Sequence, residues 1–176
     1  MKAMNQPNWQ RRRSEFNHQW LKNRLLSALD SATNLMRGRI TGAGYLEDIL
    51  NQEIREWPVR RGELDSLLVD FETEMSPRTL FDAPPLAEWE SGIKRVMSEL
   101  LHEFWLVRYP VRTWIGNAQK AALTVDKSYE QLLRVQPIGM DGHVDFEFSA
   151  RFDAFCTACR ELAKTIEKFP SHIQVI

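Results

Sequence analysis

Cysteine is scarce in this chain of 176 residues, and long apolar runs are missing from it. Its two cysteines, Cys156 and Cys159, are too few and too close together to staple a secreted scaffold of this size. The stretch most like a membrane span, residues 100–111, is interrupted by His102 and Arg108 and is shorter than the roughly 20 apolar residues that a spanning helix needs. The basic N-terminus lacks the apolar stretch of a secretory signal. We therefore expect a cytoplasmic protein without a membrane partner.

Internal repeats, low-complexity segments and linker-like runs of serine, proline or glycine are also missing. A chain of 176 residues is long enough for one well-buried core and short for two. Apolar residues make up 43% of it and charged residues 27%, which is the balance of an ordinary globular protein. We expect one domain over residues 1–176.

Most of the chain has the residue spacing of amphipathic helices. Three long segments show it and are expected to form the main core: residues 86–107, 111–135 and 148–169. Two shorter helices are expected over residues 45–57 and 63–75, the second entered after Gly62. Only residues 144–148 alternate with period two, which allows a brief extended segment but no sheet. The sequence predicts an all-α bundle of five or six helices.

The first helix is unusual because its apolar side chains fall on two faces. At about 100° per residue, one face holds Leu21, Leu25, Ala28, Leu29, Ala32, Leu35 and Met36, and the opposite face holds Trp9, Phe16 and Trp20. One straight α-helix cannot bury both faces against one core. Either the chain breaks near Trp20 and residues 1–20 pack separately or protrude, or the aromatic side chains face outward. The second alternative gives a candidate binding surface: Trp9, Arg11, Arg12, Arg13, Phe16 and Trp20.

Charge is unevenly distributed, although the net charge is −1. Residues 1–39 contain eight basic and two acidic residues, residues 44–109 contain seven basic and fourteen acidic, and the remainder from Pro110 is balanced. Such asymmetry is typical of a nucleic-acid or partner surface, or of a basic segment that packs against the acidic middle of its own chain or of a second copy. Glu53 falls among apolar side chains of its helix, and Arg24 is its expected partner.

Cys156 and Cys159 form a C-x-x-C pair, but they fall well inside a predicted helix. A redox pair needs its first cysteine at a helix N-terminus, and a structural zinc site needs four ligands. Glu99 and His102 form an E-x-x-H pair, which is half of what a helical di-iron site requires. We interpret the cysteines as core residues and expect no metal or cofactor.

Arg95 and His102 lie seven residues apart, with Glu99 between them on the same helix face. This spacing resembles the Arg and His motif of the HEPN-family ribonucleases, which are small helical domains that often dimerise. The resemblance implies a metal-independent ribonuclease in which His102 moves the ribose 2′-hydroxyl proton while Arg95 steadies the phosphate. The same face lies opposite the apolar stripe, where these side chains would equally be a solvated surface.

Three hypotheses for function follow. In the first, the protein is a non-catalytic interaction module or a small subunit of a larger assembly, and it binds a protein partner or a second copy of itself. In the second, it is a HEPN-like ribonuclease using Arg95 and His102. In the third, it binds nucleic acid through Arg11, Arg12 and Arg13 together with Trp9 and Trp20.

Overall fold

The computed structural model describes residues 8–37, 48, 51–74, 109–135 and 146–169. Apart from short turns these ranges are helical, and no β-strand occurs in them. The predicted all-α class is therefore confirmed. Four long helices are present in the described part, whereas five or six were expected for the whole chain. The helix expected over residues 86–107 lies outside the described residues, as do residues 45–47, 49 and 50 of the one expected over 45–57. The described part of the latter is helical at residues 48, 51 and 52 and passes through a turn at residue 53 into a 3₁₀ helix over Ile54–Glu56.

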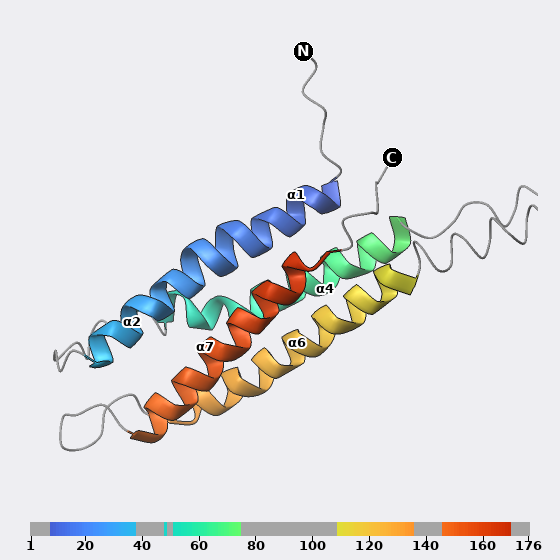
Figure 1. Cartoon of the computed structure of the whole chain (residues 1–176). Helices are drawn as coiled ribbons and strands as arrows, with labels where there is room; N and C mark the ends of the chain where they lie inside the picture. Colours follow the sequence, from blue (N-terminus) through green and yellow to red (C-terminus); the bar gives the residue numbers. More distant parts are fainter. Residues whose placement is uncertain (1–7, 38–47, 49–50, 75–108, 136–145, 170–176) are drawn as a thin grey trace, which may run out of the picture.

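The N-terminal helix, here called the first helix, is a continuous run over residues 8–37 (Figure 1, blue). It consists of α1 (Asn8–Ser14), a π-helical segment (Glu15–Leu26) and α2 (Ser27–Arg37). The chain does not break near Trp20. The alternative in which its N-terminal part packs separately is therefore wrong for the described residues.

α4 (Trp57–Glu74) follows a 3₁₀ turn (Ile54–Glu56) and begins six residues earlier than expected. Proline is tolerated in the first turn of a helix because its missing N–H would have no intrahelical acceptor there. Pro58 therefore marks the start of the helix. Gly62 is an exposed position within α4, where an added Cβ would meet nothing within 4 Å, so it does not interrupt the helix.

α6 (Tyr109–Leu133) and α7 (Phe146–Glu167) confirm the two clearest sequence predictions, since each begins and ends two residues before the expected position. The brief extended segment expected over residues 144–148 is wrong for residues 146–148, which form the start of α7. Residues 146–148 are helical because Phe148 continues the helical spacing of the apolar side chains that follow it, Phe152 and Phe155, and this pattern is longer than the alternation over residues 144–148. None of the described helices is both long and apolar enough to cross a membrane.

The four helices form a ring in which the first helix and α6 each pack against both α4 and α7 (Figure 1). Neighbouring helices run antiparallel, as in an up-down-up-down bundle. Trp9 lies against Phe71 near the end of α4, with ring centroids 4.6 Å apart, and Trp20 lies against Trp57 at its start, at 6.1 Å.

Buried side chains from all four helices form one hydrophobic cluster. Four aromatic rings close one end of the cluster. Three come from the first helix, α4 and α6, and the fourth follows the end of α7 by two residues: Trp9, Phe71, Trp114 and Phe169. Their contacting centroids are 4.6 to 5.6 Å apart. Aromatic pairs at this spacing stabilise a core beyond the area that they bury.

Candidate binding groove

The three aromatic residues expected to face outward lie in the core. Trp9, Phe16 and Trp20 are each at most 4% exposed, so the hypothesis of an outward-facing aromatic stripe is wrong. The reason is the π-helical segment, whose hydrogen bonds span five residues instead of four, so that residues four and five positions apart share a face. Phe16, Trp20, Leu21 and Leu25 have this spacing, and all four are buried.

The three arginines beside these rings contact their own chain. Arg12 forms an ion pair with Asp70 of α4, and Arg11 lies 3.6 Å from Glu15 one turn along the same helix. Arg13 places its guanidinium over the aromatic rings at the end of the core. Of these contacts, only that of Arg12 with Asp70 joins the basic N-terminal segment to the acidic middle of the same chain.

Glu53 meets the partner expected from the sequence. Its Oε2 lies 3.4 Å from Nη2 of Arg24, and the same Nη2 lies 3.5 Å from Oε2 of Glu56. The carboxylate of Glu56 also accepts hydrogen bonds from Trp20 Nε1 at 3.2 Å and from Arg60 Nη2 at 3.0 Å. The prediction for Glu53 and Arg24 is confirmed, and the group connects the first helix to the start of α4.

A similar group connects α4 to α6. Asp126 accepts a hydrogen bond from Trp57 Nε1 at 2.8 Å and another from Arg61 Nε at 3.0 Å. In both groups a partly buried carboxylate satisfies an indole N–H and an arginine, as buried polar groups require. Both groups thus hold the bundle together.

Cys156 and Cys159 are free, buried thiols well inside α7, as predicted. Burial raises the pKa of Cys156 to about 12 and the pKa of Cys159 well above its ordinary value. The thiolate is the form that attacks electrophiles and binds metals, so both side chains are held in their unreactive form. Across the described residues, no group of three or more His, Cys, Asp or Glu side chains is placed to hold a metal ion.

The residues of the ribonuclease hypothesis, Arg95, Glu99 and His102, lie outside the described residues. The hypothesis therefore stays a prediction.

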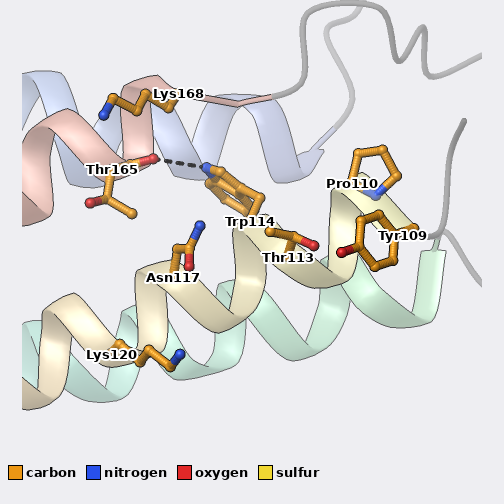
Figure 2. A pocket seen from close by; sticks show the side chains of 8 residues that line it. All are labelled: Tyr109, Pro110, Thr113, Trp114, Asn117, Lys120, Thr165 and Lys168. Atoms are coloured by element: carbon orange, nitrogen blue, oxygen red, sulfur yellow. Dashed lines mark hydrogen bonds between the residues drawn. The ribbon is translucent and has the colours of Figure 1, made fainter. Parts of the chain in front are cut away.

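A groove lies between the first turns of α6 and the end of the α7 segment (Figure 2). It encloses about 510 Å³ and is lined by Tyr109, Pro110, Thr113, Trp114, Asn117, Lys120, Thr165 and Lys168. The indole of Trp114 is almost fully buried and donates a hydrogen bond of 3.0 Å to the carbonyl oxygen of Thr165. That carbonyl belongs to the last turn of α7, where no intrahelical donor is available. Trp114 therefore holds the two walls of the groove together.

The α6 wall continues into a row of cations, here called the α6 basic stripe: Lys120, Lys127 and Arg134. They recur every seven residues, so they share a helix face and span about 21 Å at the usual helical rise. All three are exposed, and none lies within 4.0 Å of a carboxylate of the described residues. Lys168, on the opposite wall of the groove, likewise has no such carboxylate. Arg55 and Arg112 are also exposed without such a partner among the described residues, whereas Arg12, Arg24, Arg60, Arg61, Arg151 and Arg160 all have acidic partners.

The sequence contains a signal for this surface that charge counting over long segments did not reveal. Exposed polar side chains recur at intervals of three and four residues along α6: Thr113, Asn117, Lys120, Thr124, Lys127, Gln131 and Arg134. Because the region after Pro110 is balanced in net charge, charge counting hid the basic residues of this face, which also carries Glu130 between Lys127 and Arg134. Helical projection of charge would have located the stripe.

The chain matches no protein-family model, and comparison with curated proteins and with solved structures likewise finds no match. Its function is therefore inferred from its own side chains.

Proposed function

We propose that the protein is a non-catalytic helical interaction module that binds an acidic segment of a partner protein along α6. The observation that supports this is the α6 basic stripe, whose three cations are exposed without carboxylate partners in the described residues. Charged surfaces that meet a partner are arranged to match opposite charge, which speeds encounter and fixes orientation.

The groove adds an anchor to this charged surface. Tyr109 and Pro110 provide accessible apolar surface, while Thr113 and Asn117 provide hydrogen-bonding groups beside it. Interfaces gain most of their affinity from a few well-packed side chains and much of their selectivity from polar groups around them. An apolar side chain of the partner would occupy the groove, and its acidic side chains would lie along the stripe.

The spacing of the stripe favours a helical partner. Cations at every seventh residue of α6 are about 10 Å apart, which is two helical turns. A second helix lying along α6 with acidic residues at the same spacing would place one carboxylate near each cation. A two-fold contact between copies through this stripe would instead bring like charges together, which is unfavourable.

The test uses a fluorescein-labelled helical peptide with glutamates at seven-residue spacing, titrated into the full chain and followed by anisotropy. Binding is expected to weaken at least about tenfold when Lys120, Lys127 and Arg134 are all changed to Glu. The matched control changes Arg11, Arg160 and Lys164 to Glu, which alters net charge equally at exposed positions elsewhere, and it should bind nearly as the unmodified protein does.

Equal loss of binding in the two triple variants would show that net charge alone attracts the peptide, and the proposal would fail. It would also fail if a labelled single-stranded oligonucleotide bound the same surface more tightly than the peptide, because the partner would then be a nucleic acid.

A further inference from the structure

A second cleft lies between the first helix and the end of α7, and it encloses about 430 Å³. Seven residues line this N-terminal cleft: Gln10, Arg13, Ser14, Asn17, His18, Ile166 and Glu167. The volume is within the range of pockets that hold small molecules. The lining is mostly polar, unlike the apolar floor of the α6 groove.

Asn17 is the only polar residue of the described ranges that is buried as a whole, with 2% of its surface exposed. Its Oδ1 has no hydrogen-bond partner. A buried amide oxygen without a partner is unfavourable, and nearly all such groups in folded proteins are hydrogen-bonded to protein or to ordered water. In a cleft, a polar group of a ligand can take the place of that water. Because the amide oxygen and nitrogen of an asparagine can exchange places by rotation, either can be turned toward a molecule in the cleft.

Arg13 lines the same cleft, one turn before Asn17. Its guanidinium carbon lies 4.4 Å from the centroid of Phe169 and 5.7 Å from that of Trp9, so aromatic rings hold the cation in place. No carboxylate of the described residues forms an ion pair with it. Burial accordingly lowers the pKa of Arg13 from its ordinary value, because no acidic group compensates the desolvation.

We propose that the N-terminal cleft binds a small organic anion, with its carboxylate or phosphate group on Arg13 and a neighbouring hydroxyl or amide group on Asn17. The planar guanidinium presents paired N–H donors that match either kind of anion. The ring contacts fix the guanidinium before binding, which reduces the entropy lost when the anion is held.

One acidic side chain also lines the cleft, and its charge is compensated. Glu167 forms an ion pair with Lys22 of the first helix. The charge of Arg13 thus remains available for a ligand. This site is separate from the α6 groove, since none of its lining residues is shared with that groove.

The test titrates the full chain with inorganic phosphate and, separately, with citrate, at constant ionic strength set by sodium chloride. Either probe is expected to raise Tm by about 4 °C at ten times its Kd, because a ligand that binds only the folded state stabilises it by mass action. Response to phosphate alone or to citrate alone would support the proposal and identify the anionic group.

Arg13→Met keeps the apolar stem on the rings and removes the guanidinium, so the rise in Tm should disappear. Asn17→Asp places a negative charge in the cleft and should abolish the rise as well. Arg11→Met is the matched control, because it removes the same charge two residues away at a position outside the cleft, and it should respond like the unmodified protein. An equal response of Arg13→Met and Arg11→Met would overturn the proposal.

Amide chemical shifts of the unmodified protein provide a readout that does not depend on how the variants fold. Citrate or phosphate should move the resonances of residues 10–18 and 166–167 and leave those of residues 120–134 in place. Shifts confined to other helices, or no shift beyond that produced by chloride, would contradict the assignment.

Discussion

The contact between α6 and α7 differs in kind from the contact between the first helix and α4. α6 and α7 approach each other closely over most of their length, and small buried side chains permit this approach: Ala118, Ala122, Ala158, Cys159 and Ala163. The first helix and α4 are joined by large rings and charged groups, with Trp20 between Glu56 and Arg60. One contact depends on close packing, whereas the other depends on particular partners.

This difference explains which helices could be predicted accurately from the sequence. Close packing of two regular helices requires only a stripe of apolar and small residues, and such a stripe has a period that can be recognised. A contact made of tryptophan, carboxylate and arginine requires residues that are far apart in the chain to meet. Local spacing indicates such a meeting only where a charged residue falls within an apolar stripe, as Glu53 does. It gave no indication for Trp20, Glu56 and Arg60.

Trp20→Ala is expected to have the largest effect, because it removes a fully buried ring and leaves Glu56 without its indole donor. The loss in the free energy of unfolding should be about 3–5 kcal/mol, measured by urea denaturation. A loss below about 1 kcal/mol would mean that Trp20 is exposed, and the core assignment of the first helix would be wrong.

Ala122→Leu tests the close packing of α6 against α7. Extra methyl groups at a position with no exposed surface should force the helices apart and destabilise the protein by about 1–3 kcal/mol. The neighbouring residue Leu123 is 52% exposed, so Leu123→Ala is the control and should change stability by less than about 0.5 kcal/mol. Similar effects at both positions would show that α6 is not oriented as described.

Glu56→Gln tests the partner-dependent contact with almost no change of shape. The variant removes the negative charge near Arg24 and Arg60, and it should lower stability by about 1–2 kcal/mol. Glu130→Gln is a control on the exposed surface of α6 and should be nearly neutral. If the two variants proved equally stable, the charged group would not contribute to holding the first helix on α4.

Ionisation of the Cys156 thiol is expected to give the smallest change in the free energy of unfolding. The sign of this change follows from the burial of the thiol. The folded pKa of Cys156 is raised to about 12 from an ordinary value of 9.0, so the stabilising contribution is fully present below pH 9. It is lost as pH rises from there toward 12, because the unfolded thiol ionises first. Between pH 8 and pH 10 the unmodified protein should lose about 1 kcal/mol more stability than Cys156→Ala. An identical pH dependence would show that the thiol is accessible.

The fold class, α6, α7 and the burial of the two cysteines could all be predicted, since each rests on residue spacing within one helix. The pairing of Glu53 with Arg24 was also predicted, because an acidic side chain within an apolar stripe needs a basic partner. The burial of Trp9, Phe16 and Trp20 in the core was not predicted. Projection at α-helical spacing assumes hydrogen bonds to the fourth residue back, and the π-helical segment departs from that assumption.

The α6 groove and the N-terminal cleft could not be predicted from the sequence, for a different reason. The α6 groove needs the end of α7 beside the start of α6, and the N-terminal cleft needs Arg13 beside residues 166 and 167. Both arise from the antiparallel arrangement of helices that are distant in the sequence. Long-range contacts of this kind are fixed by packing of the whole bundle.

The most direct measurement of the proposed function is an amide chemical-shift map of the full chain with the glutamate-bearing helical peptide. The proposal predicts that the largest shifts fall on residues 113–134 of the α6 face and on Thr165 and Lys168, and that they diminish as salt is raised. Largest shifts over residues 11–24, or no saturable shifts at low salt, would contradict it.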